Sequence, residues 1–453
     1  MLTQYSMENF TIDNQTFNDL NIFSSNDGSK SIFDLFKFTR TMAARNRLLK
    51  IMQNPSNNVE EITSRRDVIK YFYDNRISLD LKNEEVDLIE FYLRTTFKKF
   101  KNNPVDILAD YVISRSTNDY YIIKTGLRYL IQLTKYLQHF IKCHQSNQPP
   151  NSLMLIFKRI DNIIETGVLK EAAKLNENSL KFLDVSKLDR AIRGVEKESI
   201  KSLLQLVYEV DVFENIAMVA TVKGFSFPVF KKESHVRLNI KGLFHPSISN
   251  AVKNNIHIDD KQNMIFLTGS NMAGKSSLLK SLGLVIYLSH LGFPVPADAV
   301  EITILNGLVT TINLPDDLKQ GLSHYYTEVK RIKEVAQILL KHDKMFVIFD
   351  ELFRGTNVND AFDASSLIIS ELTTVKNSFY IISTHIIELA EVLRKFDNVA
   401  FQYLDTYFEN KKPVFTYQLR KGISKETLGM YIVQNEGIVD ILQQASNNSI
   451  SKE

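Results

Sequence analysis

Hydrophobic and polar positions follow two different patterns along this chain of 453 residues. From residue 31 to residue 143, and again over Leu153 to Lys174 and Val185 to Val222, apolar residues recur at helical spacing. Such spacing places them on one face of an α-helix, where they can pack together. The first half of the chain is therefore predicted to be an all-α region.

The second half alternates short apolar runs with helical patterns, which is typical of a sheet covered by helices. Three runs are unbroken: Met264 to Leu267, Met345 to Phe349 and Phe379 to Ile382. Runs of this length indicate strands that are buried on both faces. A longer apolar stretch, Leu278 to Leu288, indicates a buried helix. We therefore expect an α/β domain with a mixed sheet and flanking helices.

These patterns divide the chain into three parts. Residues 1–30 are polar and rich in Asn and Ser, and we expect a weakly structured N-terminal segment there. Residues 31–228 are expected to form the helical domain, and residues 229–453 the α/β domain. The boundary follows from Gly224 and Pro228, which end the last long helical pattern.

The first of the three strands leads into a glycine-rich segment. Residues 269–276 read Gly-Ser-Asn-Met-Ala-Gly-Lys-Ser, which matches the phosphate-binding pattern G-x-x-x-x-G-K-[ST]. Its glycines allow backbone N–H groups to surround a phosphate, and the following helix presents its N-terminus to the same anion. Lys275 is predicted to reach the outer phosphates, and the Ser276 hydroxyl to hold Mg²⁺. The alternative is a chance turn, but only 16 residues are glycine, below the usual share of about 7%.

The other two strands end in polar residues suited to nucleotide hydrolysis. Asp350 and Glu351 follow the second run, at the strand end where ligands bind in open α/β sheets. Asp350 is predicted to join the Mg²⁺ shell, and Glu351 to orient or deprotonate the attacking water. His385 follows the third run and is predicted to sense the γ-phosphate or to position water. Without the glycine-rich segment, an acidic strand end and a structural histidine would be simpler interpretations.

Composition restricts the partners and the cellular compartment that we expect for the protein. A net charge of +3 and a pI near 8.5 permit an anionic partner without requiring one. Cys143 is the only cysteine, which excludes an intrachain disulfide and favours the cytosol. The first residues lack the pattern of a signal peptide, and no uninterrupted run of about 18 apolar residues predicts a membrane span. We therefore expect a cytoplasmic protein without membrane contact.

A lysine cluster in the first half leaves two interpretations open. Lys98, Lys99 and Lys101 end a helical pattern that begins at Val86. They could contact the phosphates of DNA, or they could be the cations that are favoured at a helix C-terminus on a solvated surface.

The glycine-rich segment closely resembles the G-P-N-M-G-G-K-S-T loop of the MutS family of DNA mismatch-repair ATPases. Ser270 replaces Pro and Ala273 replaces Gly, while Asn271 and Met272 match the pair that most phosphate-binding loops lack. The resemblance implies that ATP contacts the whole segment and the residue after it. The residues concerned are Gly269, Ser270, Asn271, Met272, Ala273, Gly274, Lys275, Ser276 and Ser277.

Three further segments resemble motifs of this family. Residues 350–356 are similar to D-E-x-G-R-G-T, with Phe353 in place of Gly. Residues 383–385 are similar to A/S-T-H. Residues 244–246 resemble R-H-P, which implies that His245 lies near the nucleotide base.

A fourth segment implies a dimer. Ser323, Tyr325 and Glu328 keep the spacing of S-x-F-x-x-E, in which the serine of the family reaches the nucleotide of the partner subunit. The resemblance thus implies an ABC-type P-loop ATPase, a homodimer that holds ATP and Mg²⁺ between its subunits. ATP would keep the pair closed through charge-assisted hydrogen bonds of the γ-phosphate, and hydrolysis would release it.

The likeness extends into the first half of the chain. Asp13, Thr16 and Leu20 resemble the start of the family's core domain, residues 33–48 the segment that follows, and residues 211–220 the end of its lever. An all-α core and lever domain before the ATPase domain is therefore implied. The family's mismatch-reading and connector domains precede this point, so we expect this chain to lack them.

Two functions follow from the resemblance. The first is an ATP-dependent DNA-binding ATPase of the mismatch-repair type, which acts on mismatched or branched duplex or together with other mismatch-repair proteins. The second keeps the ATPase but binds a protein partner as a scaffold or regulator, with little direct contact with DNA. The expected absence of the reading domains and the modest basicity favour the second function, and family membership favours the first. The intact Lys275, Asp350, Glu351 and His385 argue against a protein that binds ATP without turnover.

Overall fold

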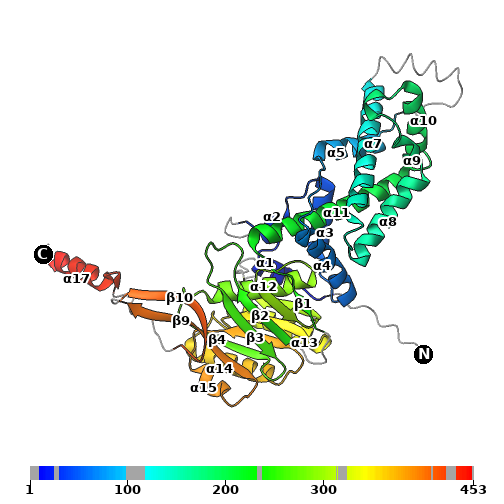
Figure 1. Cartoon of the computed structure of the whole chain (residues 1–453). Helices are drawn as coiled ribbons and strands as arrows, with labels where there is room; N and C mark the ends of the chain where they lie inside the picture. The colour runs from blue at the N-terminus through cyan, green and yellow to red at the C-terminus, as the bar shows by residue number, and fades with distance from the viewer. Residues whose placement is uncertain are drawn as a thin grey trace, which may run out of the picture.

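The computed structural model of the chain describes residues 10–24, 30–97, 118–231, 237–312, 314, 324–409, 412–424 and 435–450. It shows a helical part and an α/β part, and the long helix α11 (Lys197–Lys223) runs from one toward the other (Figure 1). Secondary structure changes between Gly224 and Val229, but the apolar core continues from one part into the other without a break. A division into domains at residue 228 therefore stays a prediction.

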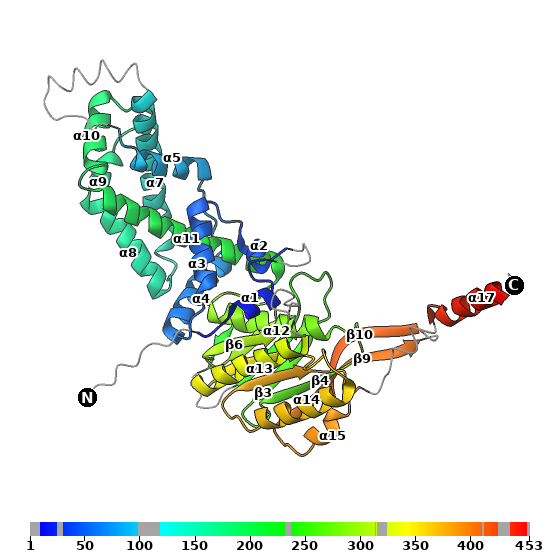
Figure 2. The same cartoon turned by 180° about the vertical axis from the view of Figure 1, so that it is seen from behind.

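The helical part consists of helices whose apolar faces meet in that core. In chain order they are α2 (Ile32–Phe36), α3 (Met42–Gln53), α4 (Val59–Asp74), α5 (Asn83–Arg94), α7 (Asn118–His144), α8 (Asn151–Thr166), α9 (Leu169–Ala172), the 3-10 turn η1 (Glu177–Ser179), α10 (Phe182–Ile192) and α11. Helix α11 contacts α8, α4 and α3 along its length (Figure 2). The prediction of an all-α region is confirmed over the described residues of this half. In the described chain, no helix is both long and apolar enough to cross a membrane.

Two of the predicted helical stretches are interrupted, and the Glu196 side chain lies at both interruptions. Its carboxylate accepts the N–H of Val168 at 2.8 and 3.0 Å. A Cβ atom on Gly167 would lie only 2.4 Å from Oε2 of Glu196. The first stretch therefore divides into α8 and α9 at Gly167, and the second into α10 and α11 at residues 193–196. Helical spacing of apolar residues continues through both breaks, which is why the pattern predicted unbroken helices.

The described residues of the α/β part form two sheets. A 6-stranded sheet has the order β10–β9–β4–β8–β7–β6, and only its edge pair β10 and β9 is antiparallel. A 4-stranded sheet has the order β1–β5–β2–β3. The strands are β1 (Val229–Phe230), β2 (Arg237–Leu243), β3 (Asn254–Asp259), β4 (Met264–Thr268), β5 (Ala299–Ile302), β6 (Gly307–Thr311), β7 (Met345–Asp350), β8 (Phe379–Ser383), β9 (Val399–Glu409) and β10 (Lys412–Lys421). The three unbroken apolar runs form β4, β7 and β8, so these predicted strands are confirmed.

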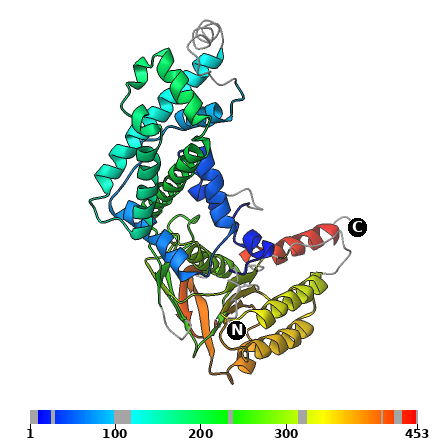
Figure 3. The ribbon, with the colours of Figure 1, turned by 90° about the vertical axis from the view of Figure 1, so that its right-hand side faces the viewer.

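Alternate residues of the central strands enter two different cores, as the pleat of a strand requires. Ile265 and Ile348 belong to the core shared with the helical part, whereas Phe266 and Phe349 belong to a second core. The buried helix α12 (Lys275–His290) lies on the first side. The helices α13 (His324–Lys341), α14 (Val358–Leu372) and α15 (Leu389–Leu393) cover the second side (Figure 3). A last helix, α17 (Ile438–Ile450), lies beyond the tip of the β9–β10 hairpin.

Residues 10–24 do not form the weakly structured segment that we expected, so this prediction is wrong for them. They contain the helix α1 (Asn14–Asp19), whose N-terminus is capped by the Asp13 side chain. Asp19 is buried and accepts the hydroxyl of Thr310 in β6 at 2.7 Å. The polar residues that suggested a loose segment cap a helix and bind the edge of the sheet instead.

The helix α12 links the two parts of the molecule directly. At its C-terminal end the carbonyl of His290 accepts the N–H of Ser56 at 2.9 Å. One turn earlier, the Tyr287 hydroxyl donates to the carbonyl of Met52. The helix that starts at the glycine-rich segment therefore ends against the connection between α3 and α4.

Candidate nucleotide-binding site

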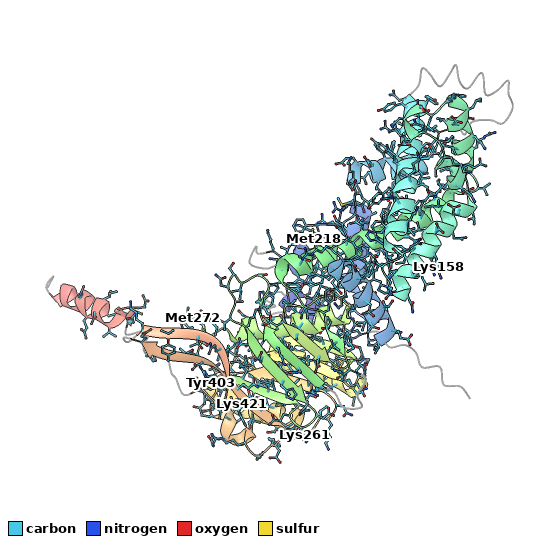
Figure 4. The ribbon with its side chains drawn as sticks, viewed as in Figure 1. Lys158, Met218, Lys261, Met272, Tyr403 and Lys421 are labelled. Atoms are coloured by element: carbon cyan, nitrogen blue, oxygen red, sulfur yellow. The ribbon has the colours of Figure 1, made fainter. Side chains whose placement is uncertain are left out.

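The glycine-rich segment forms a loop between β4 and α12, as predicted. We refer to residues 269–276 as the glycine loop. Gly269 and Gly274 have φ values of 148° and 95°, in the region that favours glycine. Met272 also has a left-handed φ of 70°, and its side chain projects into solvent beside the root of the β9–β10 hairpin (Figure 4). The loop thus has the backbone conformations for which its glycines are suited.

Lys275 lies beneath the glycine loop at the first turn of α12. Its Nζ donates to the carbonyl of Gly269 at 2.8 Å and to that of Ser270 at 3.3 Å. Burial lowers the pKa of Lys275 from its ordinary value, and the charge of Glu351, 3.8 Å away, opposes this shift. A buried ammonium group beside a helix N-terminus forms a site that attracts an anion such as phosphate.

Asp350, at the end of β7, is held by two hydroxyl groups. The Ser276 hydroxyl donates to its Oδ2 at 2.5 Å, and the Ser383 hydroxyl, from the end of β8, donates to its Oδ1. The aspartate is 5% exposed. Hydroxyl and carboxylate oxygens are the ligands that Mg²⁺ prefers, and Mg²⁺ beside a nucleotide usually takes only one or two from the protein. The donors present therefore fit Mg²⁺. The contact of Ser383 was not predicted, although this residue directly follows the third apolar run.

Glu351 lies among three basic side chains. We refer to residues 350–354 as the carboxylate turn. The Glu351 carboxylate is 3.0 Å from Nε of Arg354, 3.6 Å from Nδ1 of His385 and 3.8 Å from Nζ of Lys275. Its pKa is lowered chiefly by the contact with His385 and further by the charges of Arg354 and Lys275, while burial opposes the shift. The carboxylate is therefore ionised near neutral pH, as a group that orients water or accepts a proton must be.

The structure brings His385 and Arg354 to the exposed side of this cluster. The side chain of His385 is 58% exposed and that of Arg354 is 41% exposed. Arg354 also lies 3.7 Å from Oδ2 of Asp350, so it contacts both carboxylates of the turn. His385 was predicted as a site residue from the sequence, whereas Arg354 was expected only as the arginine of the D-E-x-G-R-G-T motif.

A cavity of about 810 Å³ lies beside the glycine loop and extends to the segment that follows β2. Cavities of about 300–1,000 Å³ are typical of small-molecule sites. His245 lies on its wall, and its place near the nucleotide base stays a prediction. Burial lowers the pKa of His245 to about 4, and the charge of Lys280 contributes. The ring is therefore neutral near neutral pH, and its Nδ1 accepts the N–H of Ser247 at 3.3 Å.

Tyr417 and Asn254 form a part of the cavity wall that sequence analysis did not predict. Asn254 donates to the carbonyl of Tyr417 at 2.9 Å and accepts the N–H of Leu419 at 2.7 Å. The pairing of β9 and β10 shifts register at this point, and Tyr417 has a φ of 56°. A Cβ atom on Gly274 would lie 3.2 Å from the Tyr417 ring, so this ring lies against the glycine loop. A bulge of this kind depends on the register of two strands, for which the sequence carries no signal.

Most of the residues predicted to bind ATP line this cavity together. They are Ser270, Asn271, Met272, Ala273, Gly274, Lys275, Ser276 and Ser277. Gly269 lies behind them, where its carbonyl accepts from Lys275. Ser323 and the lysine cluster at residues 98–101 lie outside the described residues, so their roles stay predictions.

Sequence models of a known protein family match both halves of the chain. The sequence model of MutS domain III matches residues 15–225, and that of MutS domain V matches residues 265–452. Three curated relatives are each named DNA mismatch repair protein MutS. The protein from Thermotoga sp. (strain RQ2) is 30% identical over 54% of this chain and 30% of its own length. That from Fusobacterium nucleatum subsp. nucleatum is 28% identical over 72% of this chain and 36% of its own length.

The third relative, from Petrotoga mobilis, is 22% identical over 96% of this chain and 64% of its own length. This chain thus matches between 30% and 64% of the length of these relatives. The domain III match covers the helical part with α1, and the domain V match begins in β4 and includes the glycine loop and the carboxylate turn. The chain belongs to the MutS family.

Proposed function

We propose that this chain is an ABC-type P-loop ATPase that hydrolyses ATP with Mg²⁺ and acts on DNA in mismatch repair as a nucleotide-gated dimer. One observation carries the ATPase assignment. The Ser276 hydroxyl donates to Asp350 at 2.5 Å and Lys275 lies 3.8 Å from Glu351, and Ser276, Lys275 and Glu351 line one cavity. The two parts of a phosphoryl-transfer site, which are far apart in the sequence, are therefore adjacent in space.

Each residue of the site has a separate role in the proposed hydrolysis. The N–H groups of the glycine loop and the ammonium of Lys275 bind the phosphates, for which Lys275 exchanges its two carbonyl acceptors for phosphate oxygens. Ser276 and Asp350 would hold Mg²⁺, which neutralises charge that develops on the phosphates. Glu351 orients the attacking water or accepts its proton, and His385, whose Nδ1 lies 3.6 Å from the Glu351 carboxylate, would sense the γ-phosphate or position water.

A second subunit would complete this site. The side chains of His385 and Arg354 are 58% and 41% exposed in one chain, although hydrolysis by positioned groups is most effective where bulk water is excluded. A partner that covers them would supply that exclusion, and Ser323 is the residue that the resemblance assigns to the contact in trans. ATP would favour the closed dimer only in so far as it binds that state more tightly than the open one.

The support for DNA as the substrate comes from the family. Both matched sequence models are MutS domains, and the named relatives are DNA mismatch repair proteins. Other mismatch-repair proteins are the natural further partners of such a chain. A protein-binding scaffold driven by the same ATPase is the alternative that DNA-binding measurements would favour if no DNA is bound.

ATP turnover by three variants tests the ATPase assignment. The wild-type chain should hydrolyse ATP with Mg²⁺, and Lys275→Ala should fail to bind the nucleotide. Glu351→Gln should bind ATP but turn over about 10²–10⁴-fold more slowly, because it lacks the general base. Glu391→Gln, which removes the same charge from an exposed position on α15, should match the wild type. Normal turnover by Glu351→Gln, or normal ATP binding by Lys275→Ala, would contradict the assignment.

A further inference from the structure

Phe353 has a backbone conformation that bulky residues rarely adopt. Its φ is 61°, in the left-handed region where a Cβ atom is crowded by the backbone. The MutS-like motif has glycine at this position, for which the conformation is free of that strain. Phe353 therefore has a backbone conformation that suits glycine, and contacts with the surrounding structure must stabilise this conformation.

The ring of Phe353 is held against helix α13. It is 4% exposed, and its centroid lies 5.6 Å from that of Tyr325 in the first turn of α13. The next residue, Arg354, donates its N–H to Oε1 of Glu328 at 3.3 Å, and Glu328 lies one turn further along α13. The end of the carboxylate turn is therefore held against α13 by an aromatic contact and by a hydrogen bond from the Arg354 N–H to the Glu328 side chain.

The other end of the turn is fastened to β8. Glu351 also has a left-handed φ, of 56°, and its N–H donates to the carbonyl of Ser383 at 3.0 Å. The carboxylate turn thus contains two left-handed residues other than glycine, one at each anchored end. Because a side chain follows its backbone, the direction of the Glu351 carboxylate depends on this conformation.

We propose that Phe353 is a positioning residue for ATP hydrolysis. Packed against Tyr325, its ring holds the carboxylate turn in the strained conformation that directs Glu351 toward Lys275 and the cavity. The proposal rests on the ATPase function proposed above. A glycine would allow this conformation but would also allow others, since it has no Cβ to restrict φ. With phenylalanine, the conformation persists only while the ring is buried, so the direction of Glu351 depends on the place of α13.

The kinetics of variants on both sides of the aromatic contact test this proposal. Phe353→Gly and Tyr325→Ala should lower kcat at least about tenfold, because a small displacement of a catalytic group has a large effect on rate. KM for ATP should stay within about twofold, because the glycine loop and Lys275 are unchanged. Tyr325→Phe keeps the ring and should keep kcat. Phe353→Gly should melt at a higher temperature than Phe353→Ala, because only alanine has a Cβ in the left-handed conformation.

A matched control separates positioning from a general loss of stability. Phe379→Ala removes another buried ring, at the opposite end of β8 from Ser383, and should lower the melting temperature without lowering kcat. Wild-type kcat in Phe353→Gly would overturn the proposal, and so would an equal loss of kcat in Phe379→Ala. Absence of turnover by the wild-type chain would instead refute the proposed function itself, and this inference with it.

Discussion

The protonation of His290 tests how the C-terminal end of α12 packs against the rest of the molecule. The residue is 0% exposed and its ring lies 4.4 Å from that of Phe10. Its Nε2 accepts the N–H of Leu305 at 3.1 Å, and its Nδ1 lies 2.9 Å from the carbonyl of Ile286. Because a carbonyl can only accept, the ring must be the neutral tautomer with its proton on Nδ1. A second proton on Nε2 would break the bond with Leu305 and place a charge in the core.

The size and sign of the effect follow from the pKa of His290. Burial lowers this pKa from the ordinary 6.5 to about 4 in the folded chain. A difference of about 2.5 pKa units corresponds to about 3 kcal/mol at 1.36 kcal/mol per unit. As the pH falls below 6.5, His290 binds a proton in the unfolded chain but not in the folded chain, so the free energy of unfolding decreases. This part of the stability is complete above 6.5 and is lost as the pH falls toward 4. About 2 kcal/mol should be lost by about pH 5.

Urea unfolding at two pH values measures this effect against a variant that does not titrate. His290→Gln keeps a donor and an acceptor, so other titrating groups contribute equally to both proteins. Between about pH 7.5 and about pH 5 the wild type should lose about 2 kcal/mol more free energy of unfolding than His290→Gln. Equal losses in the two proteins would refute the buried, neutral state of this ring.

Other predictions address the nucleotide site and its partners. Gly274→Ala should weaken ATP binding at least about tenfold, because a Cβ would be strained at a φ of 95° and would press on Tyr417 3.2 Å away; unchanged affinity in a titration would contradict this. Asp350→Asn should raise the Mg²⁺ concentration needed for turnover, and an unchanged Mg²⁺ dependence would remove Asp350 from the metal site. A mixture of Ser323→Ala and Lys275→Ala chains should recover part of the activity that each lacks, and no recovery would argue against sites shared between subunits. Binding to homoduplex, mismatched, branched and single-stranded DNA should fall steeply with salt if phosphates are contacted, whereas undetectable binding would favour the scaffold function.

The candidate site was predictable where its residues are contiguous in the chain. The glycine loop joins a strand to a helix over eight positions, so its conformation is largely set by the residues themselves. The unbroken runs that became β4, β7 and β8 indicated burial on both faces, and parallel strands bring their carboxyl ends to one edge. That is why the sequence alone predicted Asp350 and His385 at the same edge of the sheet as Lys275.

Other features depend on contacts between distant segments. The contact of Asn254 with Tyr417 joins positions from two different sheets, and the shift in register that it stabilises has no signature in either strand. Glu196 interrupts two helices because its carboxylate lies where they meet. The polar composition around Asp19 led us to expect a weakly structured segment. In the structure, the Asp19 side chain forms a hydrogen bond with Thr310 on β6.

By itself, the sequence determined the helical first half, the central strands β4, β7 and β8, the glycine loop and the chemical identity of the groups that end β7 and β8. Periodicity and turn chemistry are local properties, and neighbouring residues are enough to express them. Only the tertiary structure decided which side chains meet: that Lys275, Arg354 and His385 surround Glu351, and that Phe353 keeps a left-handed backbone by packing against Tyr325. Such contacts arise when the whole core closes, because the energy that fixes them is shared among segments far apart in the chain.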